Sequence, residues 1–202
     1  MTPTEDELRR DHAEGDKTTV VTHLLHTEGA AILGFLHSRL GSADAAQEVF
    51  ARFCEDLWRG IESFEWRCSL RGWAYTLARH AEARYRRDRG RAHRRQLRLD
   101  DAPAGVLAAV DHVRTTTRLH LRSEVKDRMR ALRERLPEED QTVLVLRVDK
   151  GLSWNDLATV MQGQEVDETT LAREAARLRK RFQLIKSRLR DWAREDGLLP
   201  PE

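Results

Sequence analysis

The sequence predicts an all-α protein: two small helical domains joined by a linker, the second with a helix-turn-helix. Apolar residues recur at every third or fourth position over most of the chain, which is the period of an amphipathic helix. Strand signals are scarce, since only residues 142–148 (TVLVLRV) are β-like, and they follow Pro137 and three acids, a pattern typical of a helix start. A change of composition around Pro103 and Gly105 is typical of a linker.

These signals divide the chain into four parts. Residues 1–19 are acidic, and we expect them to form a flexible N-terminus. Residues 20–95 form the first helical domain, residues 96–122 the linker, and residues 123–197 the second helical domain. A length of 202 residues is enough for two small domains, each with its own core.

Charge is distributed unevenly along the chain, although the formal net charge is only +2. Residues 66–98 contain eleven Arg against Glu82 and Asp88, whereas residues 1–16 contain six acidic residues against two Arg. Such segregation creates a local positive field that attracts a polyanion even when the whole protein is nearly neutral.

The two cysteines, Cys54 and Cys68, form no CxxC pair and have no histidines at metal-site spacing. We therefore expect reduced apolar side chains, with no metal and no cofactor. The N-terminus lacks the basic flank and apolar run of a signal peptide, and no uncharged stretch approaches the roughly 20 residues that a bilayer requires. The sequence thus predicts a soluble cytoplasmic protein without membrane insertion.

A first basic helix is predicted from Leu70 to Arg87. At 100° per residue, Trp73, Leu77 and Ala81 share one face, which we expect to be buried. Tyr75, Arg79 and Arg86 lie roughly opposite, with Arg71 at the flank, and Trp66 and Arg67 precede the helix. Guanidinium groups bind phosphates and aromatic rings stack on unpaired bases, so this face favours single-stranded nucleic acid. A solvated surface helix remains an alternative, and a membrane-surface helix is less favoured because the apolar face is rich in alanine.

A second basic helix is predicted near the C-terminus. Its apolar residues repeat from Leu171 to Trp192, and residues 171–190 contain eight basic residues with Glu174 as the only acid. Upstream, Ser153 and Asp156 form a pattern resembling a capping box, which predicts a short helix before a polar turn. This arrangement is typical of a helix-turn-helix that reads the major groove, and a core or coiled-coil helix is the alternative.

Three segments carry a resemblance to a known family. DAAQEVFARFCEDLW (44–58), SLRGWAYTLARHAEARYRR (69–87) and LRERLPEEDQTVLVLRVDKGLSWNDLATVM (132–161) resemble, in order and spacing, motifs of regions two and four of sigma-70 family RNA polymerase sigma factors, extracytoplasmic-function (ECF) group. His80 stands where the family usually has Asn. The resemblance implies a two-domain helical fold whose partners are core RNA polymerase and promoter DNA, with an anti-sigma factor as a plausible third.

The resemblance also implies roles for individual residues. Those implied to bind core polymerase are Asp44, Gln47 and Glu48. Those implied to engage the minus-ten promoter element, where the duplex opens and a non-template base is flipped, are Trp66, Arg67, Arg71, Tyr75, Arg79, His80, Arg86 and Arg87. Those implied to read the minus-thirty-five element are Thr169, Thr170, Arg173, Arg177 and Lys180. The protein would direct transcription initiation without any catalysis of its own.

Two other classes remain open. A helix-turn-helix transcription regulator acting without core polymerase explains the C-terminal block but gives no purpose to the helix that carries Asp44, Gln47 and Glu48. A helical interaction protein that binds polymerase without DNA is the other class. An enzyme is the least favoured class, because the sequence shows no glycine-rich phosphate loop, metal cluster or nucleophile–base pair.

Overall fold

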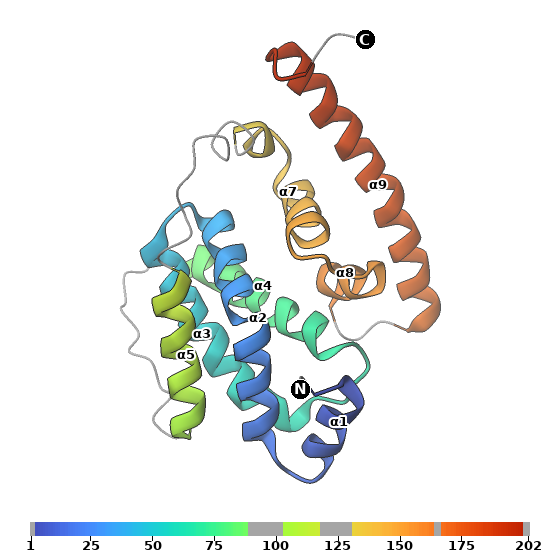
Figure 1. Ribbon diagram of the computed structural model, residues 1–202. Helices are drawn as coiled ribbons and strands as arrows, with labels where there is room; N and C mark the ends of the chain where they lie inside the picture. Colours follow the sequence, from blue (N-terminus) through green and yellow to red (C-terminus); the bar gives the residue numbers. More distant parts are fainter. Residues whose placement is uncertain (1–2, 89–102, 118–130, 164–166, 200–202) are drawn as a thin grey trace. The chain divides into compact units, whose positions relative to one another are not determined.

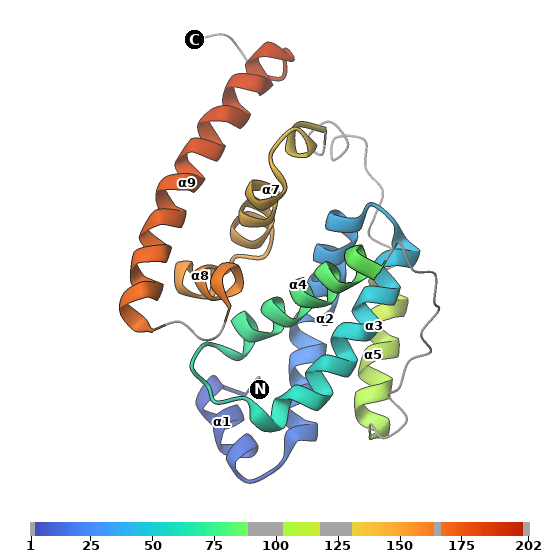
Figure 2. The ribbon, with the colours of Figure 1, turned by 180° about the vertical axis from the view of Figure 1, so that it is seen from behind.

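The computed structural model describes residues 3–88, 103–117, 131–163 and 167–199. The chain divides into two compact units, Met1–His120 and Leu121–Glu202. The described residues are helical and contain no β-strand, which confirms the all-α prediction. Figures 1 and 2 show the helices of each unit from opposite sides.

Helix α2 (Lys17–Leu40) is the central helix of the first unit, and α1, α3, α4 and α5 all pack against it. Apolar residues lie on several sides of α2, and the neighbouring helices bury them. By length and composition α2 could cross a membrane, yet half of its most apolar stretch is buried inside this unit, as in the core helix of a soluble protein. It ends at Gly41, whose φ of 65° is a left-handed conformation that glycine adopts without strain.

Helices α3 (Ala43–Gly60) and α4 (Leu70–Asp88) complete the core of this unit. Ser42 caps α3 by accepting a hydrogen bond from the Ala45 N–H, and a strongly amphipathic pattern then places Phe50 and Phe53 in the interior. A short 3₁₀ turn (η1, Ile61–Ser63) and a loop lead into α4, which packs on both α2 and α3.

The N-terminus differs from the flexible segment that we expected for residues 1–19. Residues Glu5–Ala13 form helix α1, which packs on α2 and buries Leu8. Thr4 and Glu7 form a reciprocal capping box, in which the Thr4 hydroxyl accepts from the Glu7 N–H and the Glu7 carboxylate accepts from the Thr4 N–H. The acidic composition therefore belongs to a capped helix.

The predicted linker, residues 96–122, also contains a structured element. Helix α5 (Ala104–Thr117) lies along α2 and buries Val106, Ala109, Val110 and Val113. A Cβ atom on Gly29 of α2 would lie 2.6 Å from Val113 Cγ2, so glycine is what permits the close approach of these two helices. The Pro and Gly residues near 103–105 mark the start of this helix and not a continuous linker.

The described part of the second unit contains helical residues 131–134, α7 (Glu138–Leu144), a π-helical turn (η2, Val145–Asp149), α8 (Trp154–Gln162) and α9 (Glu168–Glu195). The β-like segment 142–148 is helical and mostly buried, with Val143 and Leu146 fully inside. Burial explains its largely apolar composition, and the acids after Pro137 start the helix as the sequence indicates. The core is completed from α8 and α9 by Leu157, Ala158, Leu178 and Ile185.

Candidate nucleic-acid and polymerase interfaces

Several arginines of α4 form ion pairs with neighbouring helices. Arg71 lies 3.0 Å from Glu28 of α2, and Arg84 pairs with Asp56 of α3. The basic stripe of α4 is therefore not wholly a solvated surface: part of it anchors the helix to the rest of the unit.

Arg86 belongs to a buried ionic cluster. Arg39 Nε lies 3.1 Å from Glu82 Oε1, and Arg86 Nη2 lies 2.8 Å from the same oxygen. Arg86 also donates a hydrogen bond of 3.0 Å to the carbonyl oxygen of Arg39, in the last turn of α2. These contacts give Arg86 a structural role in joining the ends of two helices, in addition to its exposed position on α4.

Tyr75 does not lie on an exposed face, and our prediction that it stacks on unpaired bases is wrong. Its side chain is 0% exposed and packs edge-on against Phe35, with ring centroids 5.8 Å apart. Burial raises the pKa of its hydroxyl, and the negative charge of Glu28 raises it further. The helical-wheel argument failed because α4 packs against two helices, so its buried face is wider than one apolar stripe.

The other α4 residues that we predicted to bind the minus-ten element lie nearer the surface. Arg79 is half-buried, and His80 and Arg87 are exposed. Partial burial of the imidazole and the positive charges of Arg84 and Arg79 lower the pKa of His80. His80 therefore favours its neutral form, which can both donate and accept a hydrogen bond, as the amide of Asn can.

The loop before α4 carries Trp66 and Arg67. Trp66 has a φ of 57°, and it is the one described non-glycine residue with a positive φ. Its ring lies against Phe64, with centroids 4.9 Å apart, and Phe64 in turn stacks on Trp73. Arg67 is exposed and lies 2.6 Å from Glu65. The loop thus exposes a guanidinium group next to a partly covered indole ring.

Helix α1 contacts this loop directly, which the sequence reasoning missed. The indole N–H of Trp66 donates to His12 Nδ1 over 3.2 Å, and the guanidinium of Arg9 lies 5.2 Å from the indole centroid. The signal that could have revealed this helix is the sequence Thr4-x-x-Glu7, which has the spacing of a capping box.

The residues predicted to bind polymerase lie together in the first two turns of α3. Asp44 is exposed, Gln47 is half-buried, and the Glu48 carboxylate lies 2.9 Å from Arg52, one turn further on. Arg52 also contacts Asp88 at the end of α4, at 3.4 Å. Asp44 is an acidic residue in the first turn of α3, at the positive end of the helix dipole.

On α9, the predicted DNA-reading residues share one outward face. Thr169, Arg173, Arg177 and Lys180 are exposed, and the side chain of Arg177 is 78% exposed. Asp167 caps this helix by accepting from the Thr170 N–H over 2.9 Å, and the hydrogen bonds from Thr169 and Thr170 lower the pKa of its carboxyl group. The Thr170 hydroxyl is half-buried and accepts from Arg173.

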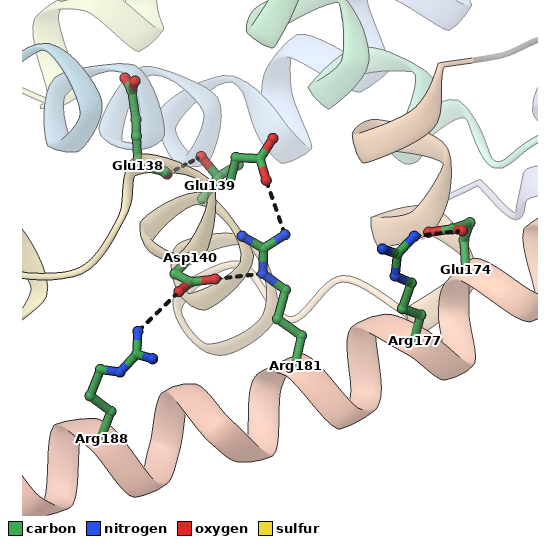
Figure 3. A network of polar contacts seen from close by, with 8 residues as sticks. Glu138, Glu139, Asp140, Glu174, Arg177, Arg181 and Arg188 are labelled. Atoms are coloured by element: carbon green, nitrogen blue, oxygen red, sulfur yellow. Dashed lines mark hydrogen bonds and ion pairs between the residues drawn. The ribbon is translucent and has the colours of Figure 1, made fainter.

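Two other arginines of α9 contact acidic residues of α7 (Figure 3). Arg181 Nε lies 2.5 Å from Asp140 and its Nη1 3.0 Å from Glu139, while Arg188 lies 3.7 Å from Asp140. Asp140 is nearly buried, so these contacts fix α9 to α7. Figure 3 shows Arg177 beside Glu174 on its own helix. The two side chains lie 3.5 Å apart. The basic residues of α9 are therefore divided between packing and an outward surface.

The N-terminus of α8 is attached to the same helix. Ser153 caps α8 by accepting from the Asp156 N–H, as the sequence predicts. Trp154 packs edge-on against Phe182 of α9, and the guanidinium of Arg147 lies 4.5 Å from the Trp154 ring centroid. These contacts attach the start of α8 to α9 and to η2. Among the described residues, no cluster of His, Cys, Asp or Glu could hold a metal ion.

Comparison with known proteins agrees with this arrangement. Residues 24–92 match the family model of sigma-70 region 2, which covers most of α2, α3, the loop and α4. Over 154 residues the chain is 30% identical to the RNA polymerase sigma-H factor of Pseudomonas aeruginosa, an alignment that covers 73% of this chain and 77% of that protein. No solved structure matches the chain. The chain belongs to the sigma-70 family of RNA polymerase sigma factors.

Proposed function

We propose that this sigma factor, of the ECF group and acting in the cytoplasm, divides its work among three surfaces. The start of α3 binds core RNA polymerase, the loop 64–69 and α4 engage the opened minus-ten element, and α9 reads the minus-thirty-five duplex. The polymerase makes and breaks the bonds, while the sigma factor supplies recognition. An anti-sigma factor would act by covering one of these surfaces.

The polymerase-binding surface is formed by Asp44, Gln47 and Glu48. Asp44 is exposed, and Glu48 keeps 42% of its side chain exposed although it pairs with Arg52. The negative charges of Asp44 and Glu48 suit a basic surface on the polymerase. Charges at the edge of an interface mainly steer the two proteins together and fix their relative orientation.

The minus-ten surface consists of Trp66, Arg67, Arg79, His80 and Arg87. Tyr75 is left out because it is buried, and Arg71 and Arg86 support α4 through their ion pairs. Cationic groups beside an indole suit a separated strand, because they bind its phosphates and stack on a base that has lost its neighbours.

The observation that carries the proposal for the second unit is the division of basic residues on α9. Arg173, Arg177 and Lys180 are exposed in the first half of α9. Arg181 and Arg188 pair with Asp140 (Figure 3). Arginines at the N-terminal part of a helix that follows a short capped helix are placed as in a major-groove reader. Thr169 and Thr170 flank them.

A charge reversal tests the role in polymerase binding. We expect Asp44→Lys combined with Glu48→Lys to abolish co-purification with core polymerase, while the variant still binds duplex promoter DNA through α9. Glu14→Lys, at the exposed end of α1, is the matched control and should bind core normally. Undiminished core binding by the double variant would refute the assignment and favour a regulator that acts without polymerase.

A further inference from the structure

We propose that α1 is a positioning element for promoter opening: Glu5 and His12 hold the loop 64–69 in the conformation that presents Trp66 and Arg67 to the separated strand. This inference rests on the proposed assignment of that loop to the minus-ten element. The residues of α1 act through the loop and do not themselves contact the DNA.

Glu5 fixes the end of the loop at the start of α4. Its Oε1 accepts a hydrogen bond of 3.1 Å from the N–H of Leu70, the first residue of that helix. Ser69 accepts from the Gly72 N–H at 2.9 Å, so the two side chains satisfy different N–H groups that have no partner within the helix. A carboxylate at this position is also favoured by the helix dipole.

His12 connects the middle of the loop to the 3₁₀ turn that precedes it. Because an indole nitrogen only donates, His12 Nδ1 must accept from Trp66, and Nε2 must therefore carry the proton. Nε2 then donates to the carbonyl oxygen of Ile61 over 2.6 Å. The neutral imidazole thus bridges the 3₁₀ turn and the indole ring in a single tautomer.

The backbone of Trp66 explains why such fixation is needed. A non-glycine residue at positive φ persists only where its surroundings impose the conformation. Phe64 lies against the indole, and α1 adds a hydrogen bond through His12 and the guanidinium of Arg9 over the ring. Without α1, the loop would relax and the indole would no longer be held in this position.

The test measures two affinities of the full-length protein: binding to core polymerase, and binding of the holoenzyme to a fluorescein-labelled single strand. The strand carries the non-template minus-ten sequence of a promoter selected in vitro with the holoenzyme. We expect Glu5→Ala and His12→Leu each to weaken strand binding. The expected loss is roughly fivefold in the binding constant, because that is the net contribution of one hydrogen bond. Core affinity should not change.

Conservative variants separate positioning from general destabilisation. His12→Asn can place an amide oxygen near the position of His12 Nδ1, where it accepts the hydrogen bond from Trp66. Its strand affinity should therefore lie within about twofold of that of the parent protein, which is less than the effect of losing one hydrogen bond. Asp6→Asn, an exposed residue on the same turn as Glu5, is the matched control and should bind like the parent. In His12→Leu, the difference in affinity between strands with the correct and an incorrect base at the flipped position should become smaller. A simple loss of folded protein would lower both affinities equally and leave this difference unchanged.

The outcomes also separate this inference from the proposed function. If Trp66→Ala and Arg67→Ala leave strand binding intact, the loop does not engage DNA and the proposed function of the loop fails. If those two variants weaken binding but the Glu5 and His12 variants do not, the role of α1 is refuted and the loop assignment stands. A gain of affinity in the His12 variant would show that α1 covers the loop, which also overturns the inference.

Discussion

Arg39 Nε lies 3.1 Å from Glu82 Oε1, and the two side chains are only 8% and 4% exposed. This pair joins the last turn of α2 to α4 inside the first unit, and Arg86 supplies a second positive charge to the same carboxylate. The position of α4, and with it the proposed minus-ten surface, depends on this interaction.

Removing one member of the pair should destabilise the first unit. We expect Glu82→Gln to lower the free energy of unfolding by about 3 kcal/mol, because it leaves Arg39 buried without its counter-charge. Urea denaturation followed by circular dichroism measures the change. Asp88→Asn, which affects an exposed ion pair with Arg52, is the control and should cost less than about 1 kcal/mol. An equal loss in both variants would contradict the structural role of the buried pair.

The buried position of Tyr75 makes a prediction that differs from that of a stacking residue. Tyr75→Phe should leave promoter opening unchanged, as judged by permanganate reactivity of the minus-ten thymines, because the aromatic packing with Phe35 is kept. Tyr75→Ala should lower the free energy of unfolding by about 3–5 kcal/mol through the cavity that it creates. Normal stability of the Ala variant with loss of opening would place the ring at the DNA after all.

The two sets of arginines on α9 should respond differently to truncation. Arg177→Ala should change the free energy of unfolding by no more than about 0.5 kcal/mol, as is usual for exposed positions. It should weaken binding to duplex promoter DNA. If Arg177 contacts a phosphate, the slope of log affinity against log salt falls by about 1; if it contacts a base, the sequence preference relaxes.

Arg181→Ala should show the opposite pattern, because this side chain attaches α9 to Asp140 and Glu139. We expect a measurable loss of thermal stability, with DNA affinity of the folded protein retained. Fluorescence-detected melting and a binding titration at low temperature distinguish the two effects. A specific loss of DNA affinity at unchanged melting temperature would mean that Arg181 belongs to the reading surface.

The glycine at position 29 tests whether α5 belongs to the first unit. Gly29→Ala would bring a methyl group to 2.6 Å from Val113 Cγ2, and we expect a loss of about 1–3 kcal/mol from the overpacked contact. Adding Val113→Ala should relieve the clash and recover part of the loss in a denaturation experiment. Independent, additive effects of the two substitutions would show that α5 does not rest on α2 in solution.

Acid should destabilise the protein through its histidines. Burial lowers the pKa of His23, and the positive charge of His26 lowers it further. The pKa of His80 is also lowered. A lowered pKa means that the unfolded chain binds the proton more readily, so this stability is fully present above the unfolded pKa of about 6.5 and is lost as the pH falls below it. His23→Gln with His80→Gln should flatten the fall in melting temperature between neutral and mildly acidic pH. If the double variant loses melting temperature with falling pH as steeply as the parent protein, His23 and His80 are not the groups responsible.

Several features with local signals could be predicted from the sequence. The amphipathic pattern of α3, the cap at Ser153 and the outward position of Arg173 all follow from spacing within one helix, and the structure agrees with each. Residues 142–148 are β-like in composition, because a mostly apolar run is compatible with a strand or a buried helix, and the acids after Pro137 indicate the helix that the structure shows.

The errors about individual side chains concern contacts between helices that are distant in the sequence, whereas α1 and α5 lie in segments that we expected to form a flexible terminus and a linker. The burial of Tyr75 depends on α2 lying against α4, which no single-helix pattern reveals. The same holds for the ion pairs that use Arg71 and Arg86. A wheel separates polar from apolar residues, but it does not distinguish an arginine facing solvent from one facing a carboxylate of the next helix.

The central claim is that one chain carries a polymerase-binding surface and two different DNA-binding surfaces. Run-off transcription by purified core polymerase on pooled genomic fragments, with and without this protein, tests it most directly. The account predicts discrete new transcripts that require the protein and vanish with Asp44→Lys/Glu48→Lys. They should also weaken with Arg173→Ala. A protein that binds duplex DNA but yields no transcript, or transcripts that persist in the double variant, would contradict the claim.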